Sequence, residues 1–384
     1  MSLETVKAAL ARRLFLQAAP REPRLDALIA PREGNDPLGE HPGTSALPWE
    51  EAALLARRVN QEPLFLHFIS RVFPEAAVLP ETRKDLESQT RFHAFRWIEI
   101  RESAEAALSA LAGKGIRPVL LKGLAYVREY YDPPHLRPMR DLDLLVKEGE
   151  VPEAHRALIQ AGFKEGGSSE EQAFYAGHHH LPPLFHGSTG MCLELHHHLM
   201  KLPAYYVGFP PLDDFWKDAR ESSAFPGKAL LLDPTLEVLN TCIHVTHGDA
   251  IGGRAQNLID LARIVEAHGD RIDWDRLARY AASPCVASSL AVPLEYLARE
   301  GLPAPSPPVR TRFIELSRLK RWELRLLFAL TSRYRLKSPG AWRLVSPRMA
   351  NVLWRQAFRR AGTLRRLGAV VTAAIAGRRK KRGN

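Results

Sequence analysis

Two aspartates separated by one apolar residue, Asp141 and Asp143, constrain the fold of this chain more than any other feature. They are followed by Leu144 and further apolar residues up to Val146, a pattern typical of a buried strand. Because side chains alternate along a strand, both carboxylates should point to one face, about 7 Å apart at Cα, while Leu142 and Leu144 face the core. Two carboxylates on one face suit a hard cation such as Mg²⁺, which proteins bind through one or two carboxylates together with substrate phosphates.

A lysine and a glycine lie shortly upstream, at the junction of a predicted strand and a predicted helix. Residues 117–123 indicate a short buried strand that ends at Gly123, and residues 124–131 favour a helix. A helix N-terminus preceded by glycine offers free backbone N–H groups and a partial positive charge, which together suit an anion. We therefore expect an anion-binding turn at Gly123, to which Lys122 adds a cation.

A third carboxylate is predicted on a later strand. Residues 191–196 alternate between apolar and polar side chains, so the leucines should face the core while Glu194 and His196 face the cleft. Three carboxylates can hold two metal ions about 3.5–4 Å apart. In this chain they would be the carboxylates of Asp141, Asp143 and Glu194. His196 is a candidate for contact with the substrate or with a metal ligand.

These elements together resemble the nucleotidyltransferase superfamily of DNA polymerase β type, in which a Gly-Ser or Gly-Gly turn opens a helix and is followed by an Asp-x-Asp pair. The chain is most similar to an uncharacterised bacterial branch with the pattern Leu-Lys-Gly, then Arg-Pro-Met-x-Asp-x-Asp-Leu-Leu-Val, then an apolar-acidic-apolar-His strand. The resemblance covers residues 97–198. Lys122 and Gly123 stand where the wider superfamily has Gly-Ser, so the hydroxyl that usually contacts a phosphate is missing and Lys122 would replace it.

The resemblance implies an α+β fold, with a polymerase β-like palm of mixed sheet and helices flanked by N- and C-terminal helical regions. It implies a Mg²⁺-dependent enzyme, with a two-metal site, that transfers a nucleoside monophosphate from an NTP such as ATP to a hydroxyl. The acceptor stays open between a small molecule, a protein and an RNA. The alternatives are a non-catalytic nucleotide- or RNA-binding protein and a component of a toxin-antitoxin module that retains the palm.

Two arginines precede the aspartate pair and allow two interpretations. Arg137 and Arg140 could bind the triphosphate as nucleotide-binding residues, with Arg137 the stronger candidate. An arginine before an acidic strand also commonly forms a local ion pair. Both interpretations stay open.

Histidines occur in two runs of three, residues 178–180 and 196–198. Consecutive residues on a strand point to opposite faces, so at most two of three could share an ion. No Cys or His spacing matches a structural zinc site. We therefore favour a polar loop for residues 178–180. On a later predicted helix, His244 and His247 are spaced to share a face, although such histidines are more often simply packed or exposed.

The net charge of +11 comes entirely from the C-terminal tail. Residues 348–384 contain 11 Lys and Arg and no Asp or Glu, interleaved with apolar residues, whereas the remainder is neutral. Such a basic amphipathic helix could bind RNA or another anionic surface. The alternative is a solvated terminal helix.

Length and composition predict a folded protein of several domains. The three cysteines are scattered, which indicates reduced thiols. The N-terminus has no sustained apolar stretch, and the longest apolar run near the C-terminus, residues 367–377, is about half of what a transmembrane span needs, so we expect a cytoplasmic location. The expected parts are an N-terminal helical region (1–95), the palm (96–215), a C-terminal helical domain (216–347) and the basic tail (348–384).

Overall fold

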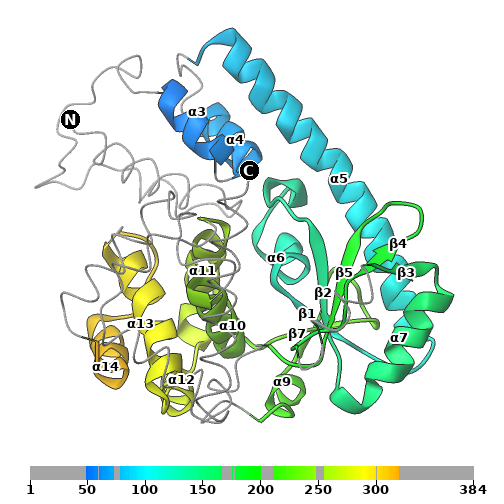
Figure 1. Cartoon of the computed structure of the whole chain (residues 1–384). Helices are drawn as coiled ribbons and strands as arrows, with labels where there is room; N and C mark the ends of the chain where they lie inside the picture. Colours follow the sequence, from blue (N-terminus) through cyan, green and yellow to red (C-terminus); the bar gives the residue numbers. More distant parts are fainter. Residues whose placement is uncertain are drawn as a thin grey trace, which may run out of the picture.

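The computed structural model describes residues 49–58, 60–72, 78–166, 175, 178–199, 211–247, 255–299 and 301–319. Residues 1–48 of the predicted N-terminal region and the whole basic tail lie outside the described residues. Within the described part, the chain combines a mixed sheet with many helices, which confirms the predicted α+β class (Figure 1). No helix of that part is long and apolar enough to cross a membrane.

The seven strands of the described sheet run in the order β3-β4-β5-β2-β1-β7-β6. Their bounds are β1 Val119–Leu121, β2 Asp141–Leu145, β3 Phe163–Glu165, β4 Leu184–His186, β5 Cys192–His196, β6 Arg220–Glu221 and β7 Leu230–Leu231. The central strand β2 is antiparallel to β1 and parallel to β5. The Asp-x-Asp segment therefore lies in the middle of the sheet, between the Lys-Gly strand and the later acidic strand.

Three helices accompany the sheet: α5 (Pro80–Ala112), α6 (Lys122–Tyr130) and α7 (Val151–Gln160). The second half of α5 buries Ile100, Ala104, Ala107, Leu108 and Leu111, which recur every three or four residues and so form one face of the helix. Figure 1 shows α5 extending from the N-terminal helices to α7 at one side of the sheet. Helix α6 packs on β1 and β2, directly after the turn expected to bind an anion.

The remaining helices belong to the N- and C-terminal regions. They are α3 (Trp49–Arg58), α4 (Glu62–Val72), α9 (Asp214–Lys217), α10 (Pro234–His247), α11 (Ala255–His268), α12 (Trp274–Tyr280), α13 (Pro284–Arg299) and α14 (Pro307–Ser317), with 3₁₀ turns at Pro134–Leu136, Glu148–Glu150 and Gly269–Arg271. Helix α10 packs on α11, α12 and α13, and α11 packs on α6. One hydrophobic core runs from the sheet into these C-terminal helices, and a smaller core joins α3, α4 and the start of α5.

Two of the predicted domain limits fall inside continuous structure. Helix α5 passes through residues 95 and 96 without a break, and β6 and β7, which follow residue 216, pair with the palm strands. The palm and the C-terminal helices share one hydrophobic core, so the centre of the sheet is packed together with helices of the C-terminal region.

Candidate active site

Two carboxylates meet at the centre of the sheet. Asp143 on β2 and Glu194 on β5 are register partners in a parallel pair, so their side chains leave the same face next to each other. His196 lies on this face as well, with its Nε2 2.9 Å from Asp143 Oδ1 and 3.4 Å from Glu194 Oε2. One ligand atom from each of the three residues lies within 4.8 Å of the others. Strand alternation therefore brings together three of the residues expected in the site.

Lys122 reaches the same point from the end of β1. Its φ of +48° places the backbone in the left-handed region, which costs about 1–2 kcal/mol for a residue with a side chain. From this conformation Nζ lies 2.5 Å from Asp143 Oδ1 and 3.8 Å from Glu194 Oε2. Helix α6 begins at Lys122 without a side-chain cap. The turn thus joins a cation, an uncapped helix N-terminus and two carboxylates.

Opposite charges stabilise one another in this cluster. Burial opposes ionisation of Asp143, yet the Lys122 ammonium and the hydrogen bond from His196 hold the pKa of the carboxyl well below its ordinary value. Burial also opposes charge on Lys122 and His196, but the neighbouring carboxylates raise the pKa of both. For Glu194, burial is outweighed by the hydrogen bond from His196, and its pKa is lowered. The carboxylates are therefore ionised at neutral pH.

Asp141 lies two residues before Asp143 on β2 and is half-buried, opposite Cys192. It is not in the group of Asp143, Glu194 and His196 whose ligand atoms lie within 4.8 Å of one another. Its carboxylate still contributes to raising the pKa of Lys122, which places it within electrostatic reach of the cluster. The described structure therefore brings two of the three predicted carboxylates into direct proximity and leaves the third at the start of the strand.

Arg137 is buried behind the turn. Its Nε and Nη2 donate to Asp260 of α11 at 3.0 and 2.7 Å, so the guanidinium is held by a carboxylate 123 residues away. A Cβ atom at Gly123 would lie 2.5 Å from Arg137 Nη1 and 2.9 Å from Met139 Cγ, which explains why this position has no side chain. Arg140, the other predicted phosphate ligand, is exposed.

Asp260 was not predicted as the partner of Arg137. It also accepts hydrogen bonds from the Tyr131 hydroxyl at 2.6 Å and from Gln256 Nε2 at 3.1 Å, and it is fully buried. Its position in the mainly apolar segment Leu258–Val265, which contains only Asp260 and Arg263 as charged residues, is a sequence signal that could have marked it, because buried carboxylates are almost always paired.

His180 adds an imidazole beside the cluster. It forms an isolated antiparallel bridge with His196, and its Nε2 lies 3.9 Å from Glu194 Oε2. Burial lowers the pKa of His180 and of its neighbour His179. This end of the site is therefore lined by neutral imidazoles.

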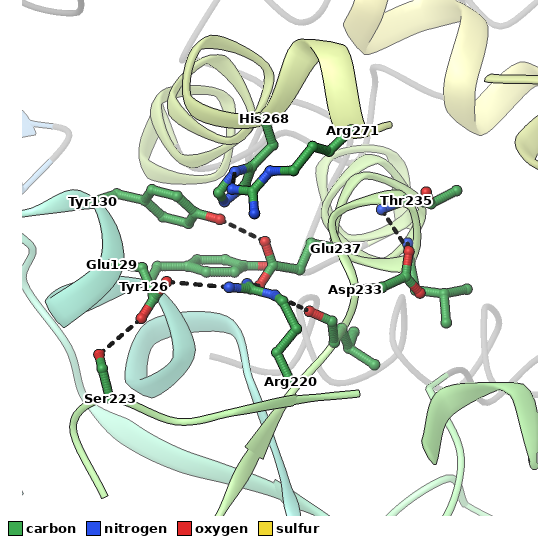
Figure 2. A network of polar contacts seen from close by, with 12 residues as sticks. Tyr126, Glu129, Tyr130, Arg220, Ser223, Asp233, Thr235, Glu237, His268 and Arg271 are labelled. Carbon is green, nitrogen blue, oxygen red and sulfur yellow. Dashed lines mark hydrogen bonds and ion pairs between the residues drawn. The ribbon is translucent and has the colours of Figure 1, made fainter. Parts of the chain in front are cut away.

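A second polar network fixes α6 against the C-terminal helices (Figure 2). The Tyr130 hydroxyl donates to Glu237 Oε2 of α10 at 2.5 Å, and Arg220 of β6 donates to Glu237 Oε1 at 3.2 Å. Tyr126 on α6 bonds Thr241 of α10 at 2.7 Å. Burial raises the pKa of Glu237 to about 7, against the opposing pull of Arg220. Two hydrogen bonds, from Tyr130 and Tyr126, thus anchor the helix that follows the predicted anion-binding turn to α10.

An acidic pair on adjacent central strands, facing a turn that opens a helix, is the arrangement that the resemblance implied for a nucleotidyltransferase palm. A comparison with protein-family models matches residues 45–299 to a family described as "Uncharacterised nucleotidyltransferase". The chain belongs to this family, as its motifs indicated. No curated protein and no solved structure matched the chain.

Proposed function

We propose that this protein is a Mg²⁺-dependent nucleotidyltransferase that moves a nucleoside monophosphate from an NTP to a hydroxyl acceptor. The observation that carries the proposal is the register pairing of Asp143 with Glu194, next to the cationic turn at Lys122. Transfer of a phosphoryl-type group needs little covalent chemistry from the protein and depends on positioning and on compensation of negative charge. A carboxylate pair beside a cation and a helix N-terminus supplies both.

The donor set fits the expected metal. Asp143 and Glu194 offer ionised carboxylate oxygens, the ligands that Mg²⁺ prefers, and Asp141 on the same face of β2 would complete the set. His196 would act through its hydrogen bond to Asp143, because imidazole nitrogen suits other metals better. When bound, Mg²⁺ would neutralise charge on the phosphates and orient them.

Each remaining residue has a defined task in this proposal. Lys122 and the first N–H groups of α6 would contact the triphosphate, and Arg140 is exposed and available for the same purpose. Arg137 would act indirectly, because its guanidinium packs against Gly123 and is held by Asp260. One of the carboxylates would accept the proton of the acceptor hydroxyl.

The acceptor is proposed only as a hydroxyl of a small molecule, a protein or an RNA. The basic tail, residues 348–384, favours RNA because it concentrates 11 positive charges without an acidic residue.

The test uses the purified full chain with each α-labelled NTP, Mg²⁺ and a cell extract. Label should enter an extract component with the wild type, and the isosteric variant Asp143→Asn should reduce transfer by at least about 100-fold, in line with the loss of a main electrostatic contact. Asp141→Asn should also impair transfer. Glu153→Gln, an exposed acidic position on α7, is the matched control and should keep full activity. Full transfer by Asp143→Asn would overturn the proposal, and nucleotide binding without transfer would favour a non-catalytic palm.

A further inference from the structure

The histidine run 178–180 lies outside the carboxylate pair, and its side chains converge. One ring nitrogen from each of the three residues lies within 4.8 Å of the others. The ring centroids are 4.3 to 4.7 Å apart. The alternation argument, which allowed at most two of them to share an ion, is wrong here because the three residues do not form a strand. Only His180 takes part in a β-bridge.

The backbone of this segment is held in place by the end of β5 and the residues after it. Leu181 N donates to Leu195 O at 3.0 Å, next to the bridge between His180 and His196. The N–H groups of His197 and His198 both donate to His179 O, at 3.0 and 3.1 Å. The imidazoles therefore project from a fixed main chain, which reduces the entropy lost when a ligand orders them.

In two of the three rings, those of His179 and His180, a nitrogen atom is available to a ligand. His180 Nδ1 lies 2.7 Å from Leu181 O, and since a carbonyl only accepts, this nitrogen carries the proton and Nε2 keeps its lone pair. A ring N–H bound to a backbone carbonyl is the arrangement that orients metal-ligating histidines. Among the described residues, His179 Nδ1 is buried and has no hydrogen-bond partner. A buried polar atom without a partner is costly, so a bound ion would satisfy it.

We propose that His178, His179 and His180 form a binding site for a transition-metal ion of the Zn²⁺ class, separate from the carboxylate site. Three imidazole nitrogens select Zn²⁺, Co²⁺ or Ni²⁺ over Mg²⁺. Around one Zn²⁺ at about 2.0–2.1 Å, tetrahedrally placed nitrogens are about 3.4 Å apart, so the rings need to close by at most about 1.4 Å.

The site adjoins the candidate active site. Glu194 Oε2 is 3.9 Å from His180 Nε2 and 3.4 Å from His196 Nε2, so the Glu194 carboxylate lies close to an imidazole of each group. This carboxylate could occupy an open coordination position of the ion. Occupancy of the histidine site would then fix the orientation of Glu194. The metal binding itself does not depend on the proposed transferase activity.

The experiment titrates the tag-free full chain with Co²⁺ in excess Mg²⁺, without nucleotide, and follows the visible absorption of tetrahedral Co²⁺. The wild type should bind one Co²⁺, and Zn²⁺ should displace it. His178→Ala and His179→Ala should each weaken binding at least tenfold. His198→Ala is the matched control, because it removes a nearby imidazole outside the cluster and keeps the backbone bond to His179; its affinity should match the wild type.

One further variant, Asp143→Asn, separates this site from the carboxylate site. Asp143→Asn should retain Co²⁺ binding even where it abolishes nucleotide transfer. Binding that is lost in Asp143→Asn but kept in His179→Ala would place the ion among the carboxylates and overturn the proposal. Equal affinity of His178→Ala, His179→Ala and wild type would overturn it as well. The far-ultraviolet circular dichroism of the metal-free variants verifies folding, and if one histidine variant fails to fold, the other decides.

Discussion

Replacing Asp260 with asparagine removes one charge from the buried pair that joins the C-terminal helices to the palm. Arg137 is 7% exposed and Asp260 0%, and two hydrogen bonds of 3.0 and 2.7 Å link them. Asparagine keeps the shape of the side chain and one acceptor oxygen, but the guanidinium stays buried without a counter-charge and one of the donors around Asp260 loses its acceptor. Breaking a buried pair on one side typically costs about 3–5 kcal/mol. We expect Asp260→Asn to lower the free energy of unfolding by that amount.

The exposed pair of Arg312 with Asp275 provides the matched control. Its side chains are 51% and 75% exposed, and ion pairs at such positions contribute about 0–1 kcal/mol. Asp275→Asn should therefore leave the unfolding free energy within about 0.5 kcal/mol of the wild type. The comparison holds the chemical change constant and varies burial alone.

Urea unfolding of the full chain, followed by circular dichroism, measures both variants, and Arg137→Met completes a double-mutant cycle with Asp260→Asn. Because the double variant leaves no unpaired charge in the interior, it should lose clearly less than the sum of the single losses, with a coupling of about 2 kcal/mol or more. A loss below about 1 kcal/mol in Asp260→Asn, or strict additivity in the cycle, would refute the reasoning.

Two other expectations concern the turn and its anchoring. Gly123→Ala places a Cβ atom 2.5 Å from a buried guanidinium, so the turn must shift. The affinity for a non-hydrolysable NTP, measured by isothermal titration, should fall at least tenfold. Unchanged affinity would contradict the close packing inferred at Gly123. In the folded protein, the pKa of Glu237 is about 7, above its ordinary value of 4.5. Between pH 4.5 and 7, the folded state therefore holds a proton that the unfolded state has released. The free energy of unfolding falls as pH rises through 7. Glutamine at this position does not titrate. The unfolding free energy of Glu237→Gln minus that of the wild type should therefore increase by up to about 3 kcal/mol between pH 4.5 and a pH above 7. Parallel pH profiles of the two proteins would show that Glu237 has an ordinary pKa.

Local periodicity was sufficient for the parts of the site that lie on single strands. Alternation alone places Asp143 on one face of β2 and Glu194 and His196 on one face of β5, and the structure pairs these two strands directly. Such patterns predict faces well because the side-chain period of a strand is fixed by backbone geometry. The pairing of the two strands is seen only in the structure, since no local pattern specifies it.

Contacts between distant segments were not accessible in the same way. Arg137 looked like a phosphate ligand or the member of a local pair, and its partner Asp260 lies on a helix far along the chain. Strands β6 and β7 have two residues each, too few to show a period. The convergence of residues 178–180 depends on bends that no alternation rule describes. In each of these cases the local structure depends on a contact between segments far apart in the sequence, and a local sequence pattern cannot identify the second segment.

Lys122 was expected to act as a phosphate ligand, and its position adds a second role. Its Nζ is 2.5 Å from Asp143, which is 2% exposed. The ammonium therefore adds a compensating positive charge to a buried carboxylate that also accepts a hydrogen bond from His196. The Asp143 carboxylate is also a proposed Mg²⁺ ligand, so the Lys122 ammonium and the metal ion compete for it.

Lys122→Ala should therefore destabilise the metal-free protein by about 2–3 kcal/mol, less than a fully buried pair because the lysine side chain is 25% exposed. It should also bind NTP more weakly but Mg²⁺ more tightly, since the competing cation is gone. Thermal melting with and without Mg²⁺ measures this: the metal should raise Tm more in Lys122→Ala than in the wild type or in Lys164→Ala, which removes an exposed lysine from β3. An equal rise in all three proteins would mean that the ammonium and the metal do not share Asp143, and the carboxylate pair would have to bind its ion elsewhere on this face.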